Sequence, residues 1–433
     1  MTTKQIVFIL CLLATMGVFT YTLLRIISLF KLTKPFPIRN FPKRFAVMSE
    51  VALGQTKIFR RPIIGLMHAL VFWGFCLILF GSIEMVIDGI FNTDRSLSFL
   101  GELYNFIIAS GDVFAYLVAA SIVVFLFRRL FLHIKRFTGI EMEHKSHYDA
   151  NIALSIILLL MLSLIGMNIT YAAFDNRVGV FPASSLFVKY IHCCPCIIAK
   201  WYEGFWWMHI LLIFLFANIL PYSKHFHVFM SVPNVFLSRL EPLGKLPNMD
   251  NVTREVKMML NPELAVSPDM TAEQPISRFG VKDVEDVTWK NYFDSLSCTE
   301  CGRCTSVCPA NITGKKLSPR KVVMNLRARM KEVGLQKVKN GKDFSDGKSY
   351  IKDWISEEEV WACTTCNACA QECPININHP TLIVDLRRYL VMEEAAAPAE
   401  LNAIFSNIEN NGAPWQYSSE DRMLWAKDLT KNN

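Results

Sequence analysis

Eight cysteines between residues 298 and 373 repeat one spacing, which is typical of iron–sulfur cluster binding. Each copy has three cysteines separated by two residues, a fourth after three more residues, and then a proline. Structural zinc and disulfide bonds are the alternatives, but zinc would use two pairs of cysteines rather than two such quartets. We therefore predict two [4Fe–4S] clusters. The first copy is Cys298, Cys301, Cys304 and Cys308, and the second is Cys363, Cys366, Cys369 and Cys373.

The longer spacing and the proline point the fourth cysteine of each copy away from the first three. We therefore expect the two copies to exchange this ligand, so that each cluster takes three thiolates from one copy and one from the other. The first cluster is assigned to Cys298, Cys301, Cys304 and Cys373, and the second to Cys363, Cys366, Cys369 and Cys308.

Three histidines in or beside apolar segments form a second set of candidate ligands. Ionisable groups at membrane depth are costly and are often functional. His209 and His227 are eighteen residues apart, which on one continuous helix places them on the same face, about 27 Å apart. His68 should lie at the depth of His227, and we predict that these two bind one haem b. Whether His209 binds a second haem stays open, because the second span has Ile78 and Glu84 at the depth where a histidine ligand would be needed. Hydrogen-bonded structural histidines are the alternative.

The elements that must position these residues follow from the composition. The chain has 433 residues, 52% of them hydrophobic, and a mean hydropathy of +0.28, which is high for a soluble protein. The apolar residues concentrate in the first half, which predicts a membrane domain followed by a polar one. The expected membrane spans are Ile6–Leu24 and about Ile63–Phe91, Ile107–Leu132, Ile152–Phe174 and Phe205–Phe229.

The formal net charge of +7 is better explained by membrane topology than by a nucleic-acid site, because the basic residues gather at the ends of apolar segments. Loops rich in Lys and Arg face the cytoplasm. We therefore expect a multi-pass protein of the bacterial inner membrane with its cluster domain in the cytoplasm. The rich loops contain Lys31, Lys34, Arg39, Lys43, Arg44, Lys57, Arg60 and Arg61, and then Arg128, Arg129, Lys135, Arg136 and Lys145.

The polar half is predicted to be helical, because the alternation of apolar and polar residues that is typical of strands is absent. Ser318-Pro319 predicts a helix start, Ser356 and Glu359 form a capping box, and Leu382–Glu394 predicts another helix. The expected fold class is all-α: a five-helix transmembrane cytochrome-b-like bundle followed by an α-helical two-cluster ferredoxin domain. The expected domains are the haem b domain at 1–230, a polar linker at 231–288, the dicluster domain at 289–395, and a partner-docking tail at 396–433.

The first 240 residues or so resemble the gamma subunit of respiratory nitrate reductase, a dihaem cytochrome b that oxidises quinol. The resemblance rests on Pro221 to Pro233 and on His209. It implies that His209 and His227 are haem ligands on the fifth span and that His68 is the cytoplasmic-side ligand on the second. The chain departs from that family in lacking the other histidine of the second span.

The polar half resembles the cluster domain of succinate dehydrogenase and the C-type component of heterodisulfide reductase. The tail, Leu401 to Leu429, resembles the segment that leads into two cysteine-rich CCG domains in heterodisulfide-reductase D-type proteins and in electron-transfer-flavoprotein:menaquinone oxidoreductases. This implies a separate subunit with CCG domains, like heterodisulfide reductase B, as the partner.

The resemblance implies an electron-transfer subunit that works between electron-transfer flavoprotein and menaquinone or another quinone. No residue is expected to act as an acid–base or nucleophilic catalyst, so enzyme activity would belong to a complex. Two alternatives stay open: a heterodisulfide-reductase-like thiol or disulfide reaction, and a haem-free tethered ferredoxin or redox sensor.

Two groups of residues are expected at the outer face. Cys193 and Cys196 could form a disulfide there. Cys194 lies next to Cys193 in the sequence, and the segment has no haem c attachment motif. Glu84, Asp88 and Asp112 are either interfacial residues or acceptors of quinone protons.

Overall fold

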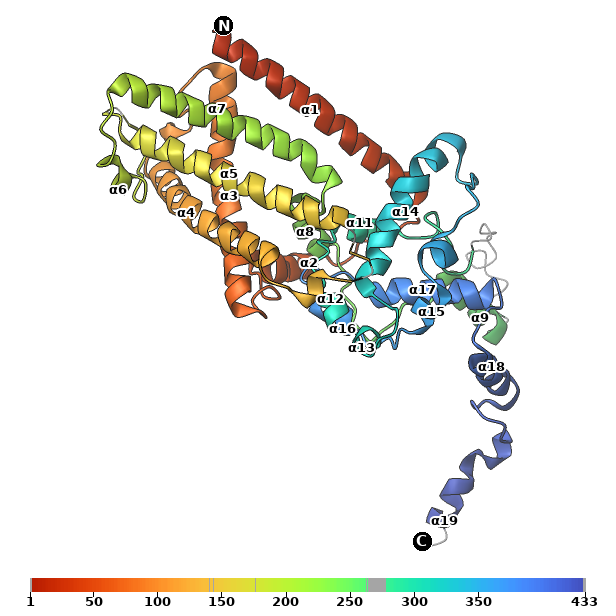
Figure 1. The fold of residues 1–433 in the computed structure, drawn as a ribbon. Helices are drawn as coiled ribbons and strands as arrows, with labels where there is room; N and C mark the ends of the chain where they lie inside the picture. Colours follow the sequence, from red (N-terminus) through yellow and green to blue (C-terminus); the bar gives the residue numbers. More distant parts are fainter. Residues whose placement is uncertain are drawn as a thin grey trace.

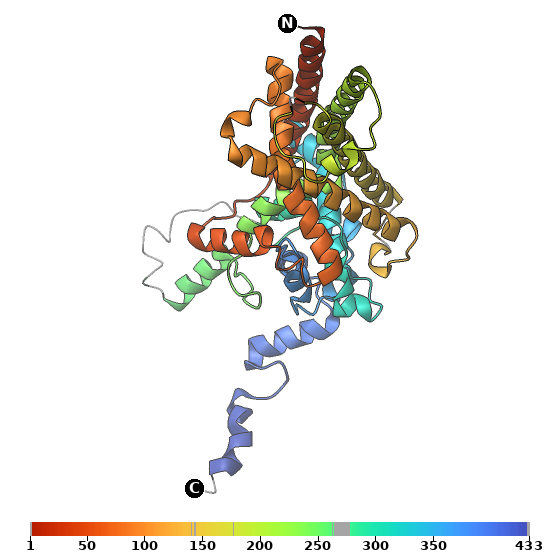
Figure 2. The same ribbon diagram turned by 90° about the vertical axis from the view of Figure 1, so that its left-hand side faces the viewer.

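The computed structural model describes residues 2–139, 141–142, 144–175, 177–261, 263 and 278–430. Within these residues the chain forms helices, turns and two isolated bridges, without a strand. Long helices form a bundle at one end, shorter helices form a compact domain beside it, and the C-terminal segment extends away from both (Figures 1 and 2). The predicted all-helical fold class is confirmed.

Five helices are long and apolar enough to cross a membrane. Each such segment has 27 to 30 residues, which at 1.5 Å per residue gives about 40 Å, more than the ~30 Å of a hydrocarbon core. Helices α3, α4, α5 and α7 pack in sequence order, and α1 lies against α3 and α7. The helices are α1 (Thr3–Leu29), α3 (Pro62–Phe91), α4 (Glu102–Leu130), α5 (His144–Ala172) and α7 (Pro195–Ile219).

The expectation of one continuous fifth helix through His227 is wrong. Helix α7 ends at Ile219, and two short 3-10 turns, Leu220–Tyr222 and Lys224–Phe226, follow it. Pro221 lies in the first turn, where it has no N–H to donate to a helical ladder. His227 begins a separate helix, α8 (His227–Phe236). His209 and His227 therefore do not share a helix face, and the five-turn estimate of their separation does not apply.

The cluster domain is built around α14 (Pro319–Asn340), whose residues Leu326 and Met330 lie in the core. Its predicted start is confirmed, because the Ser318 hydroxyl accepts a hydrogen bond from the Lys321 N–H at 3.3 Å. The predicted capping box of Ser356 and Glu359 is present as well. The other helices are α11 (Trp289–Ser297), α12 (Arg303–Ser306), α13 (Pro309–Ile312), α15 (Glu357–Trp361), α16 (Ala368–Glu372) and α17 (His379–Met392).

The bundle and the cluster domain share one core. Leu29 and Leu32, at the end of the first membrane segment, pack with residues of α14. Farther along, the Lys34 N–H donates to the Val287 carbonyl at 2.8 Å, and the Trp289 N–H donates to the Lys34 carbonyl at 2.9 Å. The first membrane segment therefore reaches directly into the polar half.

The predicted linker is packed at its beginning. Asn234 of α8 is fully buried and donates to the Asp294 carboxylate at 3.0 Å and to the Ile375 carbonyl at 2.9 Å. Residues 231–236 thus belong to α8 and the core. Helix α9 (Asp250–Leu260) is mostly exposed, and residues 264–277, with Pro268 and Pro275, lie outside the described residues.

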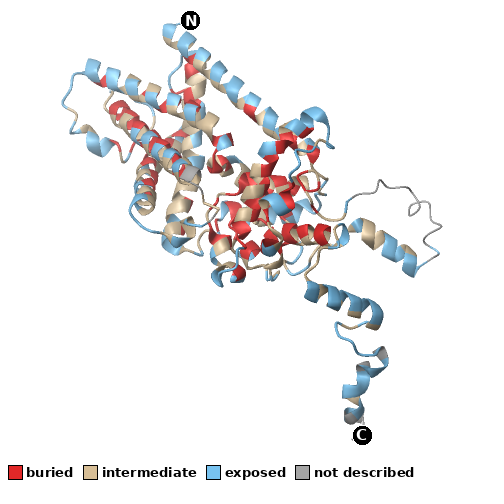
Figure 3. Ribbon diagram, turned by 45° about the vertical axis from the view of Figure 1, so that its right-hand side comes forward, coloured by how far each residue is buried: buried red, intermediate tan, exposed pale blue. Residues whose placement is uncertain are grey.

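The tail makes few contacts with the rest of the chain. Helix α18 (Ala399–Asn411) has no buried residue, and the turn Ser419–Ala426 and α19 (Lys427–Thr430) follow it. Figure 3 shows this segment in the colour of exposed residues, in contrast to the buried centre of the cluster domain. Trp415 and Trp425 are among its exposed apolar side chains.

Candidate redox centres

The structure brings the cysteines within electrostatic range of one another in two adjoining groups. Burial raises the pKa of the Cys304 thiol; the neighbouring thiols of Cys301, Cys298 and Cys373 raise it further, and Cys369 of the other group acts last. Around Cys369 the neighbouring thiols are those of Cys363, Cys308 and Cys366, and burial first and these neighbours next raise its pKa to about 12. Each group thus contains three cysteines of one copy and the fourth cysteine of the other. These are the sets predicted for the two clusters, and the ligation itself stays a prediction.

The two copies also share an unusual backbone. Glu300 and Gly302 of the first copy have φ values of 56° and 72°, and the matching Thr365 and Asn367 of the second have 52° and 60°. Left-handed residues at these two places turn the chain sharply between successive cysteines, which lets three thiols face one centre. Glycine and asparagine tolerate this conformation, whereas Glu300 and Thr365 adopt it at a steric cost.

Basic side chains attach the cysteine loops to their surroundings. Arg327 donates to the Cys298 carbonyl at 3.3 Å, and Arg387 occupies the same place in the second copy, where it donates to the Cys363 carbonyl. From the loop before α3, Lys57 donates to the Cys373 carbonyl at 3.2 Å. These contacts place positive charge beside both thiol groups, which favours their thiolate form.

The surroundings of His227 are compatible with the predicted ligand role. Its Nδ1 lies 3.0 Å from the Lys224 carbonyl oxygen. Donation to that carbonyl fixes the proton on Nδ1 and leaves Nε2 free, the arrangement common to metal-binding histidines. Burial lowers the pKa of His227, which keeps the ring neutral. The His225 ring centroid lies 5.8 Å away.

His68 lies close to His227, as the sequence predicts. The His68 imidazole is within electrostatic range of the His227 imidazole and of the Arg303 guanidinium. The Nδ1 atom of His68 is buried and has no hydrogen-bond partner among the described residues. A buried ring nitrogen without a partner and a neighbouring imidazole of fixed tautomer fit a haem b, whose iron would take one nitrogen from each ring.

The surroundings of His209 do not fit a haem. His209 is 2% exposed, and its Nδ1 lies 3.0 Å from the Leu160 carbonyl and 2.9 Å from the Ser163 hydroxyl. The adjoining cavity measures about 50 Å³ and is lined by His209 and Ile78 among other residues. Drug-sized ligands occupy about 300–1,000 Å³. The Nδ1 contact of His209 with a carbonyl is of the same kind as that of His227, so it is the small cavity that favours a structural, hydrogen-bonded role for His209.

All three outer acidic residues hold loops in place. The Asp112 carboxylate is fully buried and accepts hydrogen bonds from the Ala183 and Ser184 N–H groups at 2.9 and 3.0 Å. Glu84 accepts from the Leu97 N–H and the Tyr104 hydroxyl, both at 3.1 Å. Asp88 accepts from the N–H groups at positions 95 and 96, at 3.0 and 3.1 Å. These contacts support the interfacial, structural interpretation of the three carboxylates.

The outer cysteines are free thiols. Cys193, Cys194 and Cys196 are all exposed, and the disulfide expected from the sequence is not formed in this structure.

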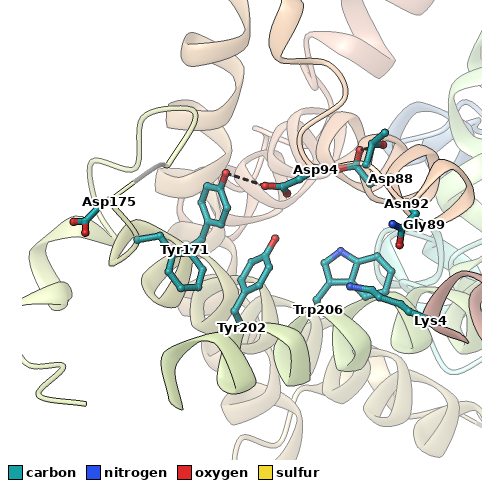
Figure 4. Close-up of a pocket in the computed structure, with 11 residues that line it drawn as sticks. Lys4, Asp88, Gly89, Asn92, Asp94, Tyr171, Asp175, Tyr202 and Trp206 are labelled. Atoms are coloured by element: carbon teal, nitrogen blue, oxygen red, sulfur yellow. Dashed lines mark hydrogen bonds between the residues drawn. The ribbon is translucent and has the colours of Figure 1, made fainter. Parts of the chain in front are cut away.

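A cavity of about 520 Å³ lies at the end of the bundle away from the cluster domain. Tyr171, Tyr202 and Trp206 supply its aromatic lining, and Asp88 and Asp94 its acidic lining (Figure 4). The Tyr171 hydroxyl donates to Asp94 at 3.5 Å. The sequence did not predict this cavity, because residues of α1, α3, α5, α7 and the loop after α3 meet only in the fold.

Comparison with known proteins assigns the class of the polar half. Residues 297–377 match the family model described as a 4Fe-4S dicluster domain. The chain therefore carries a two-cluster iron–sulfur domain behind five membrane-capable helices.

The curated relatives are iron–sulfur oxidoreductases. A probable iron-sulfur-binding oxidoreductase, FadF, of Bacillus subtilis is 28% identical over 89% of this chain and 55% of its own length. The EtfAB:quinone oxidoreductase of Syntrophomonas wolfei is 28% identical over 86% of this chain and 52% of its own length. A probable membrane-anchored ferredoxin of Chromohalobacter salexigens is 33% identical over 35% of this chain and 24% of its own length. The chain spans about half the length of the first two relatives. No solved structure matches it.

Proposed function

We propose that the protein is an electron-transfer subunit that connects the membrane quinone pool with a cytoplasmic redox partner. The observation that carries this proposal is the position of Arg303. It lies between Cys301 and Cys304 in the sequence and is within electrostatic range of His68, which is in turn within electrostatic range of His227. The predicted haem ligand His68 therefore lies near the first group of cysteines, and the second group adjoins the first, because Cys369 is within electrostatic range of Cys304.

A haem b held by His68 and His227 would supply a one-electron carrier at the membrane end of this path. The residues of the chain orient and shield the site. The Lys224 carbonyl fixes the tautomer of His227, and the Nδ1 atom of His68 is buried. The resemblance of residues 1–240 to the nitrate reductase gamma subunit supports the same assignment.

The quinone is expected to react near the cluster side of the bundle. Electron tunnelling falls steeply with distance, and His209, about halfway along α7, has surroundings that do not fit a second haem. A quinone in the cavity lined by Tyr202 and Trp206 would be separated from His68 by most of the bundle. We therefore place the quinone reaction at the lipid-facing surface beside His68.

The partner is proposed to be a CCG-domain subunit in the cytoplasm, which exchanges electrons with electron-transfer flavoprotein. The support is the relative named EtfAB:quinone oxidoreductase and the exposed apolar tail, which offers a docking segment. A heterodisulfide-reductase-like role is the second candidate, because one component of a CoB-CoM heterodisulfide reductase of Methanosarcina acetivorans is 31% identical over 24% of this chain.

Metal analysis and absorption spectra of the purified full chain test this proposal. We expect about eight iron and eight acid-labile sulfide per chain for two cubanes, with further iron as haem. Reduction with dithionite should give a b-type haem band, and addition of a menaquinone analogue should then reoxidise it. Full clusters without haem would leave a tethered ferredoxin, and zinc in place of iron would remove the electron path altogether.

A further inference from the structure

Four arginines gather where the bundle meets the cluster domain. Arg128 is in the last turn of α4, Arg61 directly precedes α3, and Arg303 is the first residue of α12. Arg136 lies in the 3-10 turn Lys135–Phe137 after α4, and this turn contacts α12 (Figure 1). We call these four residues the arginine group.

Backbone contacts bring three members of the arginine group together. The Arg303 guanidinium donates to the Ile58 carbonyl at 3.5 Å, and the Arg61 N–H donates to the same carbonyl at 3.3 Å. Gly302 lies so close to Arg136 that a Cβ atom at Gly302 would be 2.4 Å from the Arg136 carbonyl oxygen. The loop before α3 and the turn after α4 therefore both adjoin the start of α12.

Arg136 has buried donors that no protein group satisfies. Its Nε and Nη1 atoms are buried and have no hydrogen-bond partner among the described residues. The charged groups that act most strongly on it are the other three arginines and the Cys301 thiol, with no carboxylate among them. Burial first, and the charge of Arg61 next, lower the pKa of Arg136 to about 10. Buried charged donors are costly unless they are paired, so this site fits an anion with several acceptor oxygens.

Exposed apolar side chains flank the arginine group on α3 and α4, which pack against each other. Ile63 and Leu66, in the first turns of α3, are 76% and 49% exposed. Phe127 and Phe131, where α4 ends, are 52% and 72% exposed, and their ring centroids lie 5.1 Å apart. Both helices are long and apolar enough to cross a membrane, where such a surface faces lipid chains. The site therefore joins an anion-binding part to a chain-binding part.

We propose that the arginine group binds the phosphate of an anionic phospholipid, whose acyl chains lie along the exposed apolar surface of α3 and α4. Basic pockets between membrane helices bind anionic lipid headgroups. Guanidinium groups suit this role because each can donate two parallel hydrogen bonds to a phosphate. The phosphate charge would offset the repulsion among the four arginines. The lipid would thereby connect two membrane helices with the first cysteine loop, and this role does not depend on the proposed haem or quinone reaction.

Lipid titration of the purified full chain, with both clusters loaded, tests the proposal. Bound molecules are counted by native mass spectrometry after addition of phosphatidylglycerol, phosphatidylcholine or glycerol phosphate, which has the phosphate without the chains. We expect phosphatidylglycerol to fill one saturable site at least about tenfold more tightly than either of the others. Equal binding of the two lipids would mean that the iron–sulfur cluster alone balances the arginines. Equal binding of glycerol phosphate would define a site for soluble phosphate esters, and either result overturns the proposal.

The adjacent Lys135 provides a matched control, because its side chain is exposed and carries the same charge. Arg136→Gln should weaken binding of phosphatidylglycerol about tenfold, since hydrogen bonds to a charged group are lost. Lys135→Gln should change it by about twofold at most. Equal losses in the two variants would reduce the effect to general surface charge and refute the site. Phe131→Ser should also weaken binding several-fold, and unchanged binding would refute the placement of the chains.

Absorption of the clusters, and of haem where it is bound, is measured on every variant. Arg136→Gln keeps the backbone carbonyl that accepts from Arg320 at 2.8 Å, so both absorptions should stay unchanged. Arg128→Gln, on a separate element, should weaken lipid binding in the same way, which frees the test from the folding of one variant. Loss of a haem band with unchanged lipid affinity would assign the arginine group to the haem carboxylates and overturn the proposal.

Discussion

The guanidinium of Arg303 donates a hydrogen bond to the Lys57 carbonyl at 2.8 Å, and Lys57 in turn donates its ammonium group to the Cys373 carbonyl at 3.2 Å. The loop before α3 is thereby tied to both cysteine copies. Because His68 lies two turns into α3, these contacts set the position of the proposed haem ligand relative to the first cluster. The proposed electron path between the membrane helices and the cluster domain thus depends on a few contacts with backbone carbonyls.

Replacing Arg303 should disturb the first cluster selectively. Arg303→Ala removes a charge and the bonds to the Lys57 and Ile58 carbonyls, at a cost of about 1.5–3 kcal/mol for a charged hydrogen bond. Electron paramagnetic resonance of the reduced chain should show a shifted first-cluster signal and an unchanged second one. Arg387→Ala, which removes the hydrogen bond to the Cys363 carbonyl, should give the reverse pattern. Equal effects of both variants on both signals would contradict separate roles.

Exchange of the fourth cysteine between the two copies predicts that replacing it damages the cluster of the other copy. Cys308→Ser should damage the cluster whose other thiolates come from the second copy, and Cys373→Ser should damage the first. Iron content and the two resonance signals, compared between the variants, check this. Loss of the first-cluster signal in Cys308→Ser would mean that each copy binds its cluster alone.

The histidine variants separate the two ends of the bundle. His68→Ala and His227→Ala should each remove the reduced b-type band, because each variant loses one of the two proposed haem ligands. His209→Ala should leave that band at full intensity, since the surroundings of His209 do not fit a haem. Difference spectra of the three variants, normalised to cluster iron, provide the measurement. A band that halves in His209→Ala would establish a second haem.

Asp346 gives a test of stability with a defined pH dependence. Its carboxylate receives two hydrogen bonds from the fully buried Arg329, at 2.6 and 2.8 Å, and these hold its pKa below the usual range. A depressed folded-state pKa contributes stability above the unfolded value of about 3.9 and loses it as pH falls further. Asp346→Asn should therefore lower the free energy of unfolding by about 1–3 kcal/mol, equally at pH 8 and pH 5.

The exposed Asp343 is the control for this prediction. Asp343→Asn should change the urea midpoint little at either pH, since surface substitutions without specific contacts usually have small effects. If Asp346→Asn lowered the free energy of unfolding by different amounts at pH 5 and at pH 8, the pH-dependent part would belong to another titrating group.

The sequence predicted what depends on local spacing. The cysteine quartets, the helix starts at Ser318 and Ser356, and the apolar spans all follow from residues near one another in the chain. The break at Pro221 was underestimated, because the apolar residues on either side continue the hydrophobic pattern of α7. The cavity beside Tyr202 and the packing of Asn234 against Asp294 arise from distant segments, which one sequence does not connect.

The exchange of the fourth cysteine between the two groups of four thiols has a consequence for how the protein is made. Each group of four thiols needs one member from the other copy, and some sixty residues separate Cys304 from Cys363. A nascent chain that has left the ribosome only as far as the first copy can complete neither set of four cysteine ligands. Metal loading should therefore wait until both loops, with their matched left-handed turns, have folded against each other, and iron insertion should act as an all-or-none checkpoint in biogenesis.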